Sequence, residues 1–182
     1  MKSAVEQLST YKSVHLNKTN IKTHFVGIPT IIWSLVVWFS LINLPFELGD
    51  SGYSLTLAVI FFTGVAIYYF MLNVSLAIGN LVFIIPIFYS AHLVAQMPNA
   101  GWIAAAVFIF GWGFQFVGHY YEKAKPAFVD DLNQLLIGPF FLLAEVFFML
   151  GKQKKLEEEI TSLAIEKRRI FEAKQKLKQK QD

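Results

Sequence analysis

The sequence predicts an all-α, polytopic helical membrane protein with about four transmembrane helices, a re-entrant or surface hairpin and a charged C-terminal helix. Hydrophobic residues make up 55% of its 182 residues and charged residues only 16%, whereas soluble domains average about 25% charged residues. No Lys or Arg lies between Lys22 and Lys123. A soluble core does not need so long a stretch without a basic residue, so the composition excludes an ordinary soluble domain.

The first expected element is a short amphipathic helix over residues 3–15. Its apolar and aromatic side chains recur at helical spacing along one stripe, which is the pattern of an amphipathic helix. The polar residues 15–20 that follow predict a break in this helix before the first apolar run.

Four apolar runs follow, each with about 20 residues, which is the length that crosses a hydrocarbon core of about 30 Å. They extend over residues 25–44, 53–72, 75–97 and 101–119. Pro86 interrupts the third run. The connections within 72–75 and 97–101 are very short, so the helices on either side of each connection must run antiparallel.

A fifth apolar stretch, residues 132–150, contains Pro139 near its middle and Glu145 further on. A proline removes a backbone donor and kinks or breaks a helix. All 16 Lys and Arg lie in the N-terminal segment, in residues 119–131 or in the tail, and the positive-inside rule places such segments in the cytoplasm. We therefore expect four spans plus a hairpin that does not cross the membrane, with five spans as the alternative.

The tail from Lys152 onward is a charged helix with an apolar seam. Apolar residues recur every seven positions, at Leu156, Leu163, Ile170 and Leu177. Such heptads pair helices, but Lys167 and Lys174 occupy the complementary positions and weaken any pairing. We expect a solvated helix along the membrane surface that is not part of the catalyst, with a weak homodimer through this helix as the alternative.

Three of the four histidines lie near the ends of apolar runs, and two of these flank the first break. His15 and His24 are nine residues apart, so they come together only if the chain turns between them. The polar residues 15–20 permit that turn. Asn20 lies four residues before His24 and shares its helix face.

A second polar group lies at the end of the fourth run. Its spacing puts three side chains on one helix face: Gln115, His119 and Glu122. If both groups are adjacent, three histidines and a carboxylate meet in one pocket, and these donors suit ferrous iron as well as zinc or manganese. Interfacial histidines also cap helix ends, so spacing alone leaves a structural role open. His92 lies near the opposite end of the third run, and we expect it to be structural.

Two motifs resemble those of a known membrane family. The first is Tyr11-x3-His15-x4-Asn20-x3-His24-x2-Gly27-x-Pro29, and the second is Gln115-x2-Gly118-His119-x2-Glu122-Lys123. Together they resemble the signatures of the family that contains the fungal 2-hydroxy fatty acid dioxygenases of fatty acid α-oxidation. The resemblance covers residues 10–151 and stops before the heptad tail.

The resemblance implies a membrane-bound, iron(II)-dependent dioxygenase of lipid metabolism that shortens 2-hydroxy fatty acids by one carbon with O2. It implies Fe2+ as the cofactor, held by His15, His24 and His119. Glu122 is then either a fourth ligand or a hydrogen-bond partner that orients a histidine.

The same resemblance gives supporting roles to two amides, since Asn20 and Gln115 would hydrogen-bond to the ligands. Lys123 or Lys125 is a candidate partner for the carboxylate of the acid, although lysines beside a membrane more often mark topology. The expected parts of the chain are an N-terminal segment with the histidine motif (1–24), a transmembrane catalytic domain (25–151) and the charged helix (152–182).

The expected partners are a 2-hydroxy fatty acid, O2 and the lipid bilayer, and not nucleic acid, because the basic residues gather in flanks and tail. We expect an integral protein of the inner membrane in a bacterium, or of the endoplasmic reticulum in a eukaryote, with its active site on the cytoplasmic side. The alternatives are a non-enzymatic membrane scaffold that recruits a partner through the C-terminal helix, or a small transporter. The lack of intramembrane charge disfavours the transporter.

Overall fold

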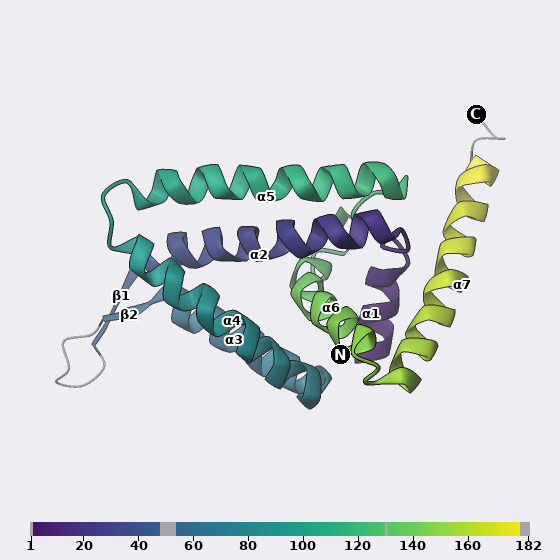
Figure 1. The fold of residues 1–182 in the computed structure, drawn as a ribbon, viewed down its shortest axis with the longest axis horizontal. Coiled ribbons are helices and arrows are strands. Elements are labelled where there is room, and N and C mark those ends of the chain that lie inside the picture. Colours follow the sequence, from purple (N-terminus) through teal and green to yellow (C-terminus); the bar gives the residue numbers. More distant parts are fainter. Residues whose placement is uncertain (1, 48–53, 130, 179–182) are drawn as a thin grey trace. The chain divides into compact units, whose positions relative to one another are not determined.

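The computed structural model describes residues 2–47, 54–129 and 131–178, and these ranges are almost entirely helical (Figure 1). The all-α fold class is therefore confirmed. The elements in chain order are α1 (Ala4–Lys12), α2 (Lys18–Ser40), β1 (Asn43–Glu47), β2 (Ser54–Thr56), α3 (Leu57–Leu72), α4 (Val74–Ala95), α5 (Ala100–Glu122), the 3-10 helix η2 (Ala127–Val129), α6 (Gln134–Met149) and α7 (Lys154–Lys178).

The chain forms two compact units. Unit 1 comprises residues 1–22 and 118–182, and unit 2 comprises residues 23–117. The division falls inside the continuous helices α2 and α5. The three parts expected from the sequence stay a prediction. In unit 1, α1 packs against both α6 and α7. The centre of this packing is fully buried and apolar, with Leu8, Ile137, Phe140 and Ile160.

The start of the chain is fixed by two helix caps. The Ser3 side chain accepts a hydrogen bond from the Glu6 N–H and begins α1, which ends at Lys12 rather than extending to residue 15. The Asn17 side chain accepts a hydrogen bond of 2.8 Å from the Thr19 N–H. This is the contact of an N-cap, which explains why α2 begins within the polar stretch at Lys18.

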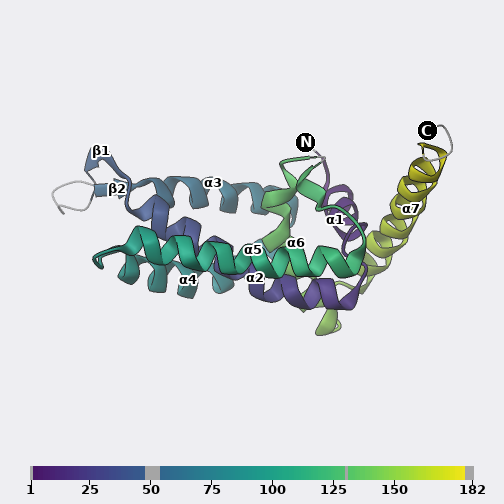
Figure 2. The same cartoon turned by 90° about the horizontal axis from the view of Figure 1, so that it is seen from above.

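Unit 2 is held together by close helix packing. Helices α3 and α4 contact each other, and α2 and α5 run alongside each other in both ribbon views (Figure 2). A Cβ atom added at Gly27 would lie 2.8 Å from the Gly111 carbonyl oxygen, and one added at Gly111 would lie 2.6 Å from the Thr30 hydroxyl. Such close approach through small residues is typical of helix pairs in membranes.

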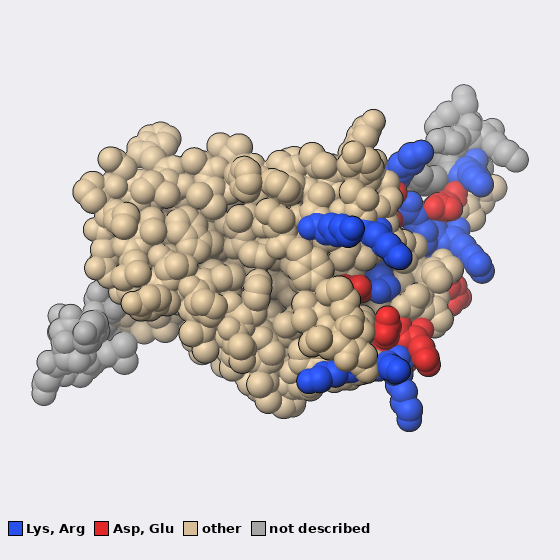
Figure 3. Space-filling model, viewed as in Figure 1, with Lys and Arg blue, Asp and Glu red and all other residues tan. Residues whose placement is uncertain are grey.

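Three helices in the described part of the chain are long and apolar enough to cross a membrane: α2, α4 and α5. The outer faces of α4 and α5 are hydrophobic, since Val82, Trp102 and Ile109 expose 70%, 80% and 71% of their surface. The acidic and basic side chains visible in Figure 3 lie on unit 1. Large exposed apolar surfaces of this kind indicate contact with lipid.

The second expected span is shorter than the sequence indicates. Residues 54–56 form β2, which pairs antiparallel with β1, so α3 begins only at Leu57 and has 16 residues. Residues 48–53, with the expected start of this span at Tyr53, lie outside the described residues. Pro86 does not end the third expected span, because α4 continues through it.

The apolar stretch 132–150 forms one helix, α6, rather than a hairpin. Pro139 lies inside this helix without ending it. The stretch is apolar because it forms the core of unit 1, where Ile137, Phe140 and Ala144 are fully buried. Glu145 pairs with Lys12 of α1, with 2.5 Å between Nζ and Oε1. An apolar core helix and a re-entrant segment have the same hydropathy, and only the packing distinguishes them.

The charged tail also differs from the expected solvated helix. Helix α7 packs against α1, and its Ile160 and Ala164 are fully buried. The last two positions of the heptad seam are open to solvent, because Ile170 and Leu177 expose 49% and 62% of their surface. The first part of α7 therefore packs against the rest of unit 1. The weak homodimer through this helix stays a prediction.

Candidate metal centre

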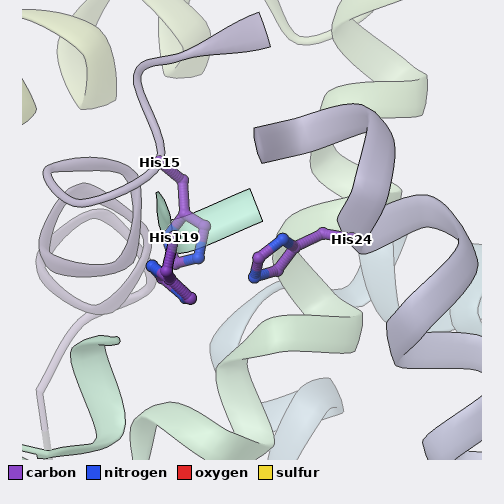
Figure 4. A group of neighbouring side chains, drawn as sticks. All are labelled: His15, His24 and His119. Atoms are coloured by element: carbon purple, nitrogen blue, oxygen red, sulfur yellow. The ribbon is translucent and has the colours of Figure 1, made fainter. Parts of the chain in front are cut away.

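Three buried histidines face one another, from the connection between α1 and α2, the start of α2 and the end of α5 (Figure 4). His15, His24 and His119 each offer a ring nitrogen, and these three atoms all lie within 4.8 Å of one another. Their exposed fractions are 1%, 1% and 9%. The three histidines that the sequence singles out are therefore brought together.

The ring of His15 is held by Tyr11, one helical turn earlier in α1. The two rings are stacked, with 4.0 Å between their centroids and an interplanar angle of 0°. The His15 Nδ1 lies 2.7 Å from the Tyr11 carbonyl oxygen. Because a carbonyl oxygen only accepts, Nδ1 carries the proton and Nε2 keeps a lone pair for a metal. Burial raises the pKa of Tyr11 above its usual range, so its hydroxyl stays neutral.

Phe141 of α6 supports the same ring from another direction. Its ring centroid lies 4.9 Å from that of Tyr11 and 5.9 Å from that of His15. The ring of His119 meets that of His15 edge-on at 4.9 Å. The Tyr11 contact has a local signal, a spacing of four residues, whereas nothing in the sequence links Phe141 to these histidines.

Glu122 binds the turn that follows His15. Its two carboxylate oxygens accept hydrogen bonds from the backbone N–H groups of Leu16, at 3.1 Å, and Asn17, at 2.8 Å. Its side chain is 3% exposed. The group of possible ligands within the described residues holds the three histidines and does not include Glu122. Glu122 thus hydrogen-bonds to the backbone of the turn beside the histidines.

The two amides that the sequence singles out lie one turn before a histidine. Asn20 is fully buried, and its Nδ2 donates to the Val14 carbonyl at 3.2 Å and to Glu122 Oε2 at 3.1 Å. Gln115 is 7% exposed. A Cβ at Gly27 would lie 2.5 Å from its Nε2, so Gln115 packs directly over that glycine.

Lys123 lies directly after α5, with a φ of 54°. This left-handed conformation is common just past the end of a helix. Lys123 and His119 both line an open pocket of about 570 Å³. The pocket residues are His119, Tyr120, Tyr121, Lys123, Ala124 and Lys125. A carboxylic acid bound in this pocket would lie beside one of the three histidines and two lysines.

His92 takes no part in this cluster. It is exposed on α4, and its Nε2 lies 3.0 Å from the Nε2 of Gln96, one turn further along the helix. Since Gln96 offers an amide N–H there, His92 Nε2 accepts that hydrogen bond.

The donor set fits a divalent transition metal. Three imidazole nitrogens with no thiolate suit Fe2+, Zn2+ or Mn2+, and three protein ligands are typical of catalytic sites that keep coordination positions open. The hydrogen bond from His15 Nδ1 to a backbone carbonyl is the contact that usually orients a ligating histidine. The chemistry and the burial of the site therefore fit the iron that the sequence motifs imply.

Comparison with known proteins identifies the family that the sequence resembles. Residues 1–150 match the model of the Mpo1-like family, described as 2-hydroxy-palmitic acid dioxygenase Mpo1-like. The chain is 30% identical over 155 residues to the 2-hydroxy-palmitic acid dioxygenase MPO1 of Saccharomyces cerevisiae, and the match covers 83% of each chain. No solved structure shows a significant match. The resemblance inferred from the sequence is confirmed.

Proposed function

The chain belongs to the Mpo1-like family, and from that premise we propose that it is a membrane-bound, iron(II)-dependent dioxygenase that shortens 2-hydroxy fatty acids by one carbon. The observation that carries this proposal is the group of three buried histidine nitrogens within 4.8 Å. We propose His15, His24 and His119 as the iron ligands. Glu122 then acts by orienting the chain around His15 rather than as a fourth ligand.

The proposed reaction balances with O2 alone. The carbon that bears the hydroxyl becomes the carboxyl carbon of the shorter acid, and the original carboxyl carbon leaves as CO2. One water forms, and O2 accepts all the electrons released, so no further reductant or co-substrate is needed. Iron(II), when bound, supplies the single-electron chemistry that lets O2 react with a closed-shell acid.

The chain's own residues bind and orient the acid. Its hydrocarbon tail partitions into the bilayer at about 0.8 kcal/mol per methylene, which leaves the carboxylate and the 2-hydroxyl at the interface. Lys123 lines the open pocket beside His119 and pairs with that carboxylate. Asn20 and Gln115 each precede a proposed ligand by one turn, where Asn20 hydrogen-bonds to Glu122 and Gln115 packs over Gly27. His15 Nδ1 keeps its proton against the Tyr11 carbonyl.

We infer that the site lies on one defined side of the membrane. Lys2 and Asp131 form an ion pair of 2.9 Å, and α7 packs against α1, so the N-terminal segment, the 123–131 segment and the tail share one side. The chain leaves unit 1 after Lys22 and returns at Gly118. The helices between these two points therefore cross the membrane an even number of times. If α2, α4 and α5 each cross it, α3 must cross it as well. The positive-inside rule makes this side cytoplasmic.

The test uses the full chain purified in detergent. Iron content is measured by elemental analysis, and a 2-hydroxy fatty acid is incubated with O2 while the acid one carbon shorter is measured. Replacing His15, His24 or His119 with Ala removes a ligand nitrogen, so we expect loss of bound iron and a fall in turnover of more than about a hundredfold.

His92→Ala is the matched control, since it removes a histidine outside the cluster and should leave iron content and turnover nearly unchanged. Wild-type protein that carries iron and yields no shortened acid would exclude the proposed reaction. An essential His92 together with a dispensable His15 would exclude the proposed ligand set.

A further inference from the structure

Arg168 of α7 connects the tail to the two chain segments that carry His15 and His119. Its Nη2 donates to the Glu122 carbonyl at 3.2 Å, and its Nη1 donates to the Ser13 carbonyl at 3.5 Å. Nη1 also lies 3.6 Å from Glu122 Oε1, and the Arg168 side chain is 16% exposed. Its Nε donates to Glu172 of the same helix, so all three guanidinium nitrogens have a hydrogen-bond acceptor.

The position of these contacts relates Arg168 to the histidines. Ser13 lies two residues before His15, and Glu122 lies three residues after His119 on the same helix face. Glu122 in turn accepts hydrogen bonds from the turn that follows His15. One guanidinium thus binds both backbone segments, the one that carries His15 and the one that carries His119.

The charge of Arg168 complements that of the buried Glu122, which also accepts hydrogen bonds from the Leu16 and Asn17 N–H groups and from the Asn20 amide. A carboxylate that is 3% exposed is strongly destabilised unless a cation or several donors compensate it. Arg168 is the cation that lies within 4.0 Å of Glu122 in the described part of the chain. Without it the buried carboxylate loses its counter-ion, and the turn that it binds is held less firmly.

We propose that Arg168 is a positioning residue for the three-histidine centre, acting through Glu122 and Ser13. This inference rests on the proposed metal site. It assigns a role in that site to α7, which lies beyond the family match over residues 1–150, and it contrasts with the expectation that the tail is not part of the catalyst.

The test measures the binding of cobalt(II) to the full chain in detergent, because the absorption of cobalt reports both affinity and ligand geometry. Arg168→Gln removes the charge, and we expect about a tenfold to hundredfold loss of cobalt affinity and an altered spectrum. Arg168→Lys keeps the charge and should recover part of the affinity. Arg169→Gln, at the exposed neighbouring position, is the matched control and should bind cobalt as the wild type does.

Arg168→Gln that binds cobalt with the wild-type affinity and spectrum would overturn the inference. If that variant does not fold, Arg168→Lys decides, because a lysine lacks the planar fork that reaches Glu122 and Ser13 together. Wild-type affinity and spectrum in the lysine variant would also overturn it. Wild-type protein that binds cobalt in this assay but, when loaded with iron instead, shortens no 2-hydroxy acid would exclude the proposed reaction and leave the role of Arg168 intact.

Discussion

The two units of this chain are stabilised in different ways. Unit 1 contains every Lys and Arg of the sequence and is fixed by polar contacts between segments far apart in the chain, such as Lys12 with Glu145 and Arg168 with Glu122. Unit 2 has no Lys or Arg, and its helices approach closely through Gly27 and Gly111. A membrane unit gains little from burying apolar groups against one another, because lipid is equally apolar, so close packing has to hold it.

This difference also provides two separate measurements. Trypsin cuts after Lys and Arg, all of which lie in unit 1, whereas the four tryptophans all lie in unit 2. The rate of tryptic cleavage therefore reports the opening of unit 1, and tryptophan fluorescence reports the unfolding of unit 2. A substitution that affects one unit should change one measurement far more than the other.

The largest effect is expected for Lys12→Met. The side chains of Lys12 and Glu145 are only 10% and 14% exposed, and removing one member of a buried ion pair typically costs about 3–5 kcal/mol. Tryptic cleavage after Arg168 should become at least about a hundredfold faster. The denaturation midpoint followed by tryptophan fluorescence should change little.

The double variant Lys12→Met with Glu145→Leu is the control for this pair. Replacing both charges with apolar side chains leaves no unpaired carboxylate, so most of the lost stability should return. If the double variant opens as fast as the single one, the pair does not act through its charges. If the fluorescence midpoint of Lys12→Met falls as steeply as the tryptic resistance, the two units do not differ in the way described.

A smaller effect in the other unit is expected for Gly27→Ala. Its added methyl would lie 2.5 Å from Gln115 Nε2 and 2.8 Å from the Gly111 carbonyl oxygen, and overpacking of this kind costs about 1–3 kcal/mol. The fluorescence midpoint should fall by a corresponding amount. Gly113→Ala is the matched control on α5, because nothing lies within 4 Å of its added Cβ. A loss of stability in Gly113→Ala equal to that in Gly27→Ala would argue against close packing as the cause.

The contrast between the units also explains what the sequence predicts well. Hydropathy identifies α2, α4 and α5, because lipid-facing helices must be apolar along their whole length. Hydropathy overestimates the length of α3, because residues 54–56 pair with β1 instead of extending the helix, and hydropathy does not detect that pairing. It also gives no means of separating α6, which is apolar because it is a core helix, from a segment that enters the membrane.

The candidate site was predictable where its signals are local. Asn20 and His24 share a helix face, as do His119 and Glu122, and the polar residues 15–20 permit the turn that brings His15 to His24. The contact of Arg168 with Glu122 spans 46 residues and joins a charged helix to a buried carboxylate. No periodicity links positions so far apart, so the sequence alone could not show it.

The smallest effect is expected for Lys2→Met, which breaks the exposed pair of Lys2 with Asp131. Their side chains are 49% and 30% exposed, and such surface pairs contribute about 0–1 kcal/mol. The hydrogen bond from Lys2 holds the pKa of the Asp131 carboxyl below its ordinary value of 3.8. The pair's stabilisation is therefore complete above pH 3.8 and is lost as the pH falls through the lower pKa of the folded state. Wild type should thus resist trypsin only slightly better than Lys2→Met at neutral pH, whereas the exposed Lys22→Met, with the same loss of charge, should match wild type. A loss in Lys2→Met as large as that in Lys12→Met would mean that burial does not separate the strong ion pairs of unit 1 from the weak ones.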